Sequence, residues 1–152
     1  YRLDVNLLET VFFTNEEGTH FVGKSDAINP SLRFDPEGIC VAKTGTFFVS
    51  DEYGPQIREF DARGRVTSRT ICVPTKFLAT QPHGDPAVEL KTNNSGRQPN
   101  RGMEGLTLSP DGRYLIFATQ RDGYLELYRL NIENPEPQRL THNTVNDYDP
   151  DW

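Results

Sequence analysis

The sequence has 152 residues, a net charge of −6 and a mean hydropathy of −0.64, and Leu, Ile, Val and Phe make up about 24% of it. This composition predicts one folded domain or a piece of one, because disordered chains contain fewer large apolar residues. The longest apolar run, residues 114–118, is far shorter than the roughly 20 residues of a transmembrane helix. The sequence contains no cluster of Lys and Arg of the kind that binding to nucleic acid requires. The sequence begins at Tyr1 without an initiator Met or a signal peptide, so we expect a processed product or a fragment.

Short runs of β-branched and aromatic residues, separated by Gly, Pro, Asn and Asp, predict an all-β fold with almost no helix. The predicted strands are residues 11–13, 39–41, 46–50, 57–60, 67–73, 106–108, 114–119, 125–130 and 138–140. Tight turns are predicted at residues 43–45 and 109–112, because Gly45 and Gly112 can adopt the positive φ that such turns need.

The two predicted hairpins repeat along the chain with an offset of 67 residues. The matched positions are Glu37 with Glu104, Gly38 with Gly105, Ile39 with Leu106, Gly45 with Gly112 and Val49 with Ile116, then, after a slip of three residues, Ile57 with Leu127 and Phe60 with Leu130. A third start is predicted at residues 148–152, which echo residues 34–38. The alternative is that any two hairpins with Gly turns look alike.

This repeat predicts a partial β-propeller of about three blades of short antiparallel strands. The blade-like units are about residues 33–81 and 101–146, with a polar insertion at 82–100 and the next blade starting at 147–152. A propeller closes with about four or more blades. We therefore expect a fragment, or a chain whose blades are completed by strands of another chain.

Two motifs occur in a fixed order and resemble one known family. The first is Arg-Phe-Asp-Pro-Glu-Gly-Ile at residues 33–39, followed by Gly-Thr-Phe-Phe-Val-Ser-Asp-Glu-Tyr-Gly-Pro at 45–55. The second is Asn-Arg-Gly-Met-Glu-Gly-Leu-Thr-Leu-Ser-Pro-Asp-Gly at residues 100–112. Over about residues 26–120, the sequence thus resembles the phytase-like, or "esterase-like activity of phytase", family. The resemblance implies an extracytoplasmic β-propeller, periplasmic or secreted, with phosphoesterase or esterase activity towards a small phosphate ester.

The C-terminal part resembles another propeller repeat. Asp-Gly at residues 122–123, Glu-Leu-Tyr at 126–128, Gln-Arg-Leu-Thr at 138–141 and Asn-Asp-Tyr-Asp-Pro-Asp-Trp at 146–152 are similar to the TolB-type repeat. This second resemblance covers about residues 111–152 and implies the same fold.

Five carboxylates occupy positions that a propeller would bring to one rim of its central channel. Glu37, Glu104 and Asp151 stand at the starts of three successive inner strands, whereas Asp51 and Glu52 end a second strand that returns to the same rim. Clustered carboxylates repel one another, and a Ca²⁺ ion with about six to eight oxygen ligands relieves that repulsion. The sequence therefore predicts a Ca²⁺ site; the alternative is that these acids cap turns or accept hydrogen bonds from nearby backbone N–H groups.

Two arginines are predicted to act in phosphate-ester hydrolysis. Arg33 and Arg101 lie just before the two inner strands, where they could bind the charge that develops on a phosphoryl group. The alternative is a solvated surface charge. In the second repeat, Ala118 and Thr119 align with the Asp-Glu pair of the first, so that repeat lacks the acidic pair.

Two functions from different classes remain open. The first is Ca²⁺-dependent hydrolysis of phosphate esters or esters at the channel rim. The second is a non-catalytic structural or binding module that self-associates through strands added between chains, because an incomplete blade exposes unpaired sheet edges. Glycosylation at Asn93, within an Asn-Asn-Ser pattern, and the pairing of Cys40 with Cys72 also remain open.

Overall fold

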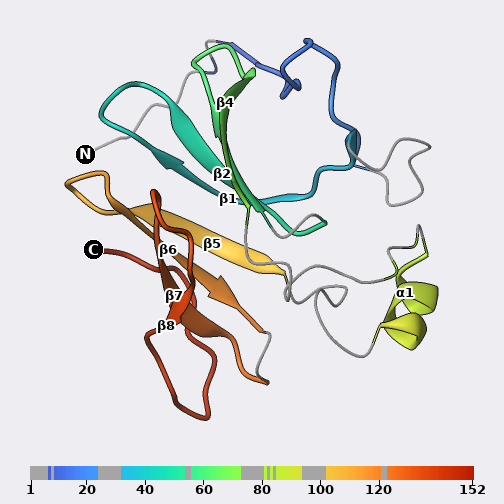
Figure 1. Ribbon diagram of the computed structural model, residues 1–152, viewed down its shortest axis with the longest axis vertical. Helices are drawn as coiled ribbons and strands as arrows, with labels where there is room; N and C mark the ends of the chain where they lie inside the picture. The colour runs from blue at the N-terminus through green and yellow to red at the C-terminus, as the bar shows by residue number, and fades with distance from the viewer. Residues whose placement is uncertain are drawn as a thin grey trace.

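Two four-stranded antiparallel sheets make up the fold in the computed structural model (Figure 1). The structure describes residues 7, 9–23, 32–53, 56–72, 81, 83, 85–93, 102–120 and 123–152. The first sheet contains, in order, β1 (Pro36–Val41), β2 (Phe47–Asp51), β3 (Gln56–Phe60) and β4 (Val66–Cys72). The second contains β5 (Met103–Leu108), β6 (Tyr114–Thr119), β7 (Glu126–Asn131) and β8 (Gln138–Arg139). Each sheet has the architecture of a propeller blade, so the predicted all-β, blade-like fold is confirmed.

The two sheets pack against each other, with the innermost strands β1 and β5 side by side (Figure 1). Alternate side chains of each sheet face this interface and form one apolar core. Its fully buried members are Phe48, Ile57 and Ile71 from the first sheet and Met103, Leu106, Leu115, Phe117, Tyr128 and Leu130 from the second. This core determines how the two inner strands lie relative to each other.

The inner strands approach so closely that glycine is required at Gly38. A Cβ atom on Gly38 would lie 2.7 Å from the backbone nitrogen of Leu106 and 2.9 Å from the carbonyl carbon of Gly105. Real Cβ atoms do not make contacts this short with backbone, so only glycine fits at Gly38. The Glu-Gly pair repeated in the sequence is therefore the point at which the two blades meet.

Both predicted hairpins are present, but the second is one residue longer. In the first turn the N–H of Ala42 donates to the carbonyl of Thr46, whereas in the second the N–H of Ser109 donates to the carbonyl of Tyr114. The extra residue shifts the alignment of β6 with β2 by one.

The alignment predicted from the sequence is therefore wrong by one residue in the second strand of each hairpin. Its later pairs, Ile57 with Leu127 and Phe60 with Leu130, are confirmed by the register of β3 and β7. Cys40 pairs with Phe48 in the first sheet, and its counterpart Thr107 pairs with Ile116 in the second. Ile116 thus corresponds to Phe48 and not to Val49. By the same shift, the Asp-Glu pair at the end of β2 corresponds to residues 119–120 and not to 118–119.

The segment 9–23 covers the outer face of the first sheet. The rings of Phe13 and Phe21 pack on Phe34 and Phe60, and the centroids of Phe13 and Phe60 are 4.5 Å apart. The predicted strand at 11–13 is wrong, because backbone pairing in this segment is limited to isolated bridges such as that from Thr14 to the turn between β3 and β4. Aromatic packing, not a β-ladder, attaches this segment.

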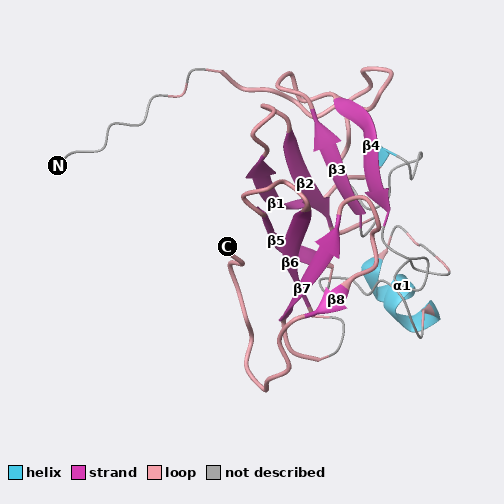
Figure 2. Cartoon of the chain, turned by 60° about the vertical axis from the view of Figure 1, so that its left-hand side comes forward, coloured by secondary structure: helices cyan, strands magenta, loops and turns pink. Residues whose placement is uncertain are grey.

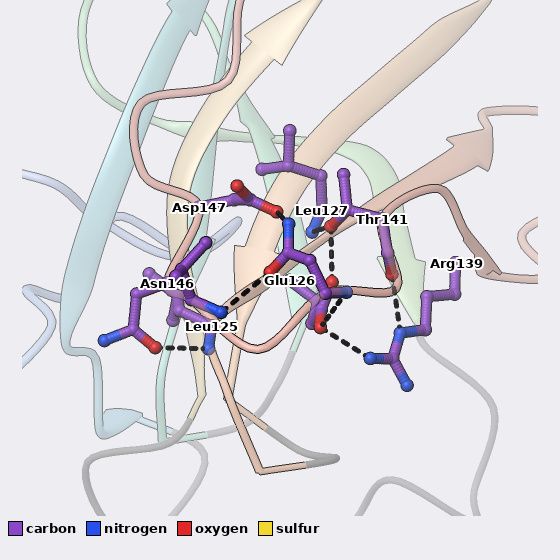
Figure 3. Close-up of polar contacts among 9 residues, drawn as sticks. Leu125, Glu126, Leu127, Arg139, Thr141, Asn146 and Asp147 are labelled. Carbon is purple, nitrogen blue, oxygen red and sulfur yellow. Dashed lines mark hydrogen bonds and ion pairs between the residues drawn. The ribbon is translucent and has the colours of Figure 1, made fainter.

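A buried carboxylate anchors the chain after β8 (Figure 3). Glu126 accepts hydrogen bonds from Thr141 Oγ1 at 2.5 Å and from Arg139 Nη2 at 2.6 Å. These donors, with Thr141 contributing most, hold the pKa of Glu126 below its ordinary value. The N–H of Leu125 donates to Asn146 Oδ1, which brings the last residues back along the second sheet (Figure 3).

The predicted polar insertion contains the short helix α1 (Pro86–Thr92), which the sequence patterns did not indicate and which lies beside the sheets (Figure 2). Asp85 caps it by accepting from the N–H of Ala87. Asn93 is buried, and its side-chain N–H₂ group donates to the carbonyls of Gln81 and Glu89. This arrangement does not favour the glycosylation that the Asn-Asn-Ser pattern suggested, since the acceptor nitrogen is engaged inside the protein.

The described residues also show the state of Cys40 and the character of the helix. Cys40 is a free thiol, and its burial raises its pKa to about 11. The side chain of Cys72 lies outside the described residues. No described helix has the length and apolar character needed to cross a bilayer.

Candidate metal centre

Three carboxylates converge where β1 begins and β2 ends. Oxygen atoms of Asp35, Glu37 and Glu52 all lie within 4.8 Å of one another. The backbone positions them, because the N–H of Glu52 donates to the carbonyl of Asp35 at 2.9 Å. We call Asp35, Glu37, Glu52 and the neighbouring Glu104 the carboxylate cluster.

Glu104 joins this cluster from the second sheet. Its carboxyl group is in hydrogen-bonding contact with that of Glu37, across the close approach of Gly38 to β5. Gly102 contributes as well, because any side chain there would overlap Glu52. The packing of the two sheets therefore builds the cluster from loops and strands that are distant in the sequence.

The proximity of these carboxylates affects the pKa of Glu37. Its pKa is raised from 4.5 to about 7, first by partial burial of its carboxyl group and then by the negative charges of Glu104, Asp35 and Glu52. Near neutral pH this carboxyl group therefore exchanges a proton, and a bound cation would favour its ionised form.

The donor set fits a hard divalent cation. Ca²⁺ binds carboxylate oxygens in flexible geometry, and three carboxylates from two segments already lie within reach of one ion. Glu37 and Asp35 are not fully buried, so water could complete the coordination.

Asp51, which the sequence grouped with these acids, points elsewhere. It is fully buried, and its Oδ1 accepts from the N–H groups of Asp35 and Tyr53 at 3.1 and 3.0 Å. Its Oδ2 lies 3.8 Å from Arg58 Nη2. Asp51 thus holds the loop that presents Asp35 and Glu52, which is the turn-stabilising role considered as the alternative.

Asp151 also lies outside the three-carboxylate group. Its side chain is exposed, and Oδ1 accepts from the N–H of Trp152. The preceding Pro150 packs over Gly105, so this segment reaches the second sheet without bringing Asp151 into the cluster.

Arg33 is buried beside this loop. Only 8% of its surface is exposed, and its guanidinium carbon lies 4.6 Å from the ring centroid of Tyr53. Within the described part of the chain its Nε has no hydrogen-bond partner. Arg101, the second predicted arginine, lies outside the described residues.

Sequence reasoning missed Asp35. The signal was present, because Asp35 belongs to the Phe-Asp-Pro-Glu-Gly corner that was used to align the repeat. Only its neighbour Glu37 was predicted, since a blade model places the first residues of the inner strands at the rim and does not position the loops that lead into them.

Comparisons with known proteins identify the family of this chain. A family model described as "Phytase-like: Esterase-like activity of phytase" matches residues 2–148. A protein of Arthroderma benhamiae described as an uncharacterized secreted protein is 28% identical over 158 residues, covering 78% of this chain and 31% of that protein. The chain thus spans about a third of the length of this relative.

Solved structures show more distant similarity. The PQQ-bound aldose sugar dehydrogenase from Streptomyces coelicolor is 18% identical, with a TM-score of 0.48, 88% of this chain and 32% of the other covered. A candidate TolB from Agrobacterium tumefaciens is 14% identical, with a TM-score of 0.34, 72% of this chain and 47% of the other covered. Because the family model spans nearly the whole sequence, the chain belongs to the phytase-like family, "Esterase-like activity of phytase".

Proposed function

We propose that this chain is part of an exported propeller in which the carboxylate cluster binds Ca²⁺ and supports hydrolysis of phosphate esters or carboxylic esters. The observation that carries this proposal is the convergence of three carboxylates within 4.8 Å, with Glu104 added from the second sheet. Membership of the phytase-like family supports the reaction class, and the secreted relative supports export.

Each residue of the site has a distinct proposed role. Asp35, Glu37, Glu52 and Glu104 would hold the ion, whose charge, when bound, polarises a phosphoryl or carbonyl oxygen and lowers the pKa of a bound water. Arg33 would bind an anionic group of the substrate, because a buried guanidinium with an unpaired Nε gains most from such a partner. Tyr53 keeps the plane of that guanidinium in place.

The proposal is tested by hydrolysis of p-nitrophenyl phosphate and p-nitrophenyl acetate in CaCl₂ or in EGTA. We expect Ca²⁺-dependent turnover of at least one substrate by the unaltered chain. Turnover should be lost in the double variant Glu37→Gln, Glu52→Gln and kept in the control Glu133→Gln, whose side chain is exposed on the loop after β7. Turnover that persists in EGTA, or that survives the double variant, would contradict the proposal.

The second candidate function is self-association by strand addition between chains. It is favoured by Ile39 and Val41 of the inner strand β1, which are 59% and 73% exposed on the face turned away from the second sheet. Exposed apolar side chains on a strand with one unpaired edge favour association with another strand. Light scattering over a concentration series, with and without Ca²⁺, tests this function: a dimer or polymer without turnover supports it, and a monomer at every concentration contradicts it.

A further inference from the structure

A second opening lies at the end of β1 and β5 opposite to the carboxylate cluster. It is a cavity of about 540 Å³ between the turn joining β1 to β2 and the turn joining β5 to β6. This volume lies within the range of about 300–1,000 Å³ that small-molecule sites occupy. The cavity shares no residue with the carboxylate cluster.

One part of the cavity wall is apolar. Ala42, Phe48, Leu108 and Pro110 line it. Phe48 is buried and Leu108 is half-buried in the core between the sheets, so the cavity is an extension of that core towards solvent. An apolar group bound here would cover the half-buried side chains of Ala42 and Leu108.

The acids in the lining are already satisfied inside the protein. Glu59 accepts hydrogen bonds from Thr46 Oγ1 at 2.6 Å and Thr67 Oγ1 at 3.3 Å. Asp111 accepts from Ser109 Oγ at 2.6 Å. The Ser109 hydroxyl group, followed by the N–H of Arg113, holds the pKa of Asp111 below its ordinary value. Neither carboxylate therefore needs a ligand as a hydrogen-bond donor.

The cations in the lining, unlike the acids, still have N–H groups available to a ligand. The Lys43 ammonium group has no ion-pair partner among the residues that the structure describes. Arg69 approaches Glu59 only through Nε, at 3.7 Å, and is 58% exposed, so its terminal N–H groups remain available. The hydrogen-bonding capacity left for a ligand is thus positively charged and stands beside an apolar wall.

We propose that this cavity binds a small organic anion with an apolar body, such as a short aliphatic or aromatic carboxylate. The anionic group lies between Lys43 and Arg69, and the apolar body lies against Ala42 and Leu108. This binding site is independent of the proposed hydrolysis, because it sits at the other end of the inner strands.

Hexanoate is the probe, and acetate and 1-hexanol are its matched controls for the apolar body and for the charge. Binding is followed by methyl NMR of Ala42 and Leu108 in the ¹³C-labelled chain. We expect hexanoate to shift both methyl signals and to bind about tenfold or more tightly than acetate, since its extra methylene groups leave water. We expect hexanoate to bind about threefold or more tightly than 1-hexanol, because only its carboxylate forms two ion pairs and solvent-exposed ion pairs are weak.

The double variant Lys43→Gln, Arg69→Gln should bind hexanoate and 1-hexanol equally, with its affinity for 1-hexanol unchanged. Lys91→Gln, on the exposed side of α1, serves as the charge control and should leave both affinities unchanged. Equal binding of acetate and hexanoate, equal binding of 1-hexanol and hexanoate to the unaltered chain, tighter binding of hexylamine, or unshifted Ala42 and Leu108 methyl signals would each overturn the proposal.

Discussion

Above pH 7 and without divalent cations, replacing Glu37 by Gln should make the protein more stable. The folded protein raises the pKa of Glu37 from 4.5 to about 7, so it binds a proton that the unfolded chain releases between these two pH values. Stability from this group is therefore fully present below pH 4.5 and is lost as the pH rises to about 7. Glutamine carries no charge and removes this loss.

The magnitude follows from the same pKa. A shift of this size corresponds to a ceiling of about 3.4 kcal/mol, at about 1.4 kcal/mol for each pH unit. Because the Glu37 side chain is exposed, solvent screens the repulsion, and we expect about 1 kcal/mol. In saturating CaCl₂ the order should reverse, since the ion stabilises the unaltered chain and has lost one ligand in the variant.

The assay is urea unfolding at pH 4.5, 6, 7 and 8, in EGTA and in CaCl₂, with Glu133→Gln as the exposed control. Without Ca²⁺, the free energy of unfolding of Glu37→Gln should exceed that of the unaltered chain at pH 8 and match it at pH 4.5. If the two proteins keep the same difference at every pH, the folded protein does not raise the pKa of Glu37, and the reasoning fails.

Three further predictions concern the packing that builds the site. Phe117→Ala, in the core between the sheets, should lower the free energy of unfolding by about 3–5 kcal/mol in chemical denaturation, whereas Ile39→Ala should change it by less than about 0.5 kcal/mol. Gly38→Ala should cost about 1–3 kcal/mol and weaken Ca²⁺ binding in calorimetry, because a Cβ there would push β1 away from β5. In a Cys72→Ser background at pH 8, Cys40 should react with a disulfide reagent only once urea unfolds the protein, as its pKa is about 11; rapid reaction of the folded protein would contradict its placement.

The strands were predictable because each one is marked by its own local sequence pattern. Alternating apolar residues and glycine turns predicted all eight strands of the two sheets to within a few residues. The segment 11–13 has the same aromatic composition as a strand, but its rings pack on the first sheet without joining it, and composition alone does not distinguish these two outcomes. The one-residue difference between the hairpins was also invisible, since each turn has its glycine three residues after the start, at Gly45 and Gly112, and the extra residue Arg113 follows the second glycine.

The site was predictable in part, for a physical reason. Glu37 and Glu104 follow from the repeat, because equivalent residues of adjacent blades face the same rim. Which carboxylates then converge depends on side-chain direction and on hydrogen bonds between loops. Asp51 turns inward to hold backbone N–H groups, while Asp35 approaches Glu52 through a backbone hydrogen bond. Neither fact can be derived from residue spacing.

The central claim is that carboxylates from both sheets share one cation, and calorimetric titration of Ca²⁺ tests it most directly. At pH 6.5, in two buffers of different ionisation enthalpy, the unaltered chain should bind one ion and release protons, because Glu37 is largely protonated at that pH. The double variant Glu37→Gln, Glu104→Gln should show no binding. Equal affinity and equal proton release in the unaltered chain and the double variant would contradict the claim.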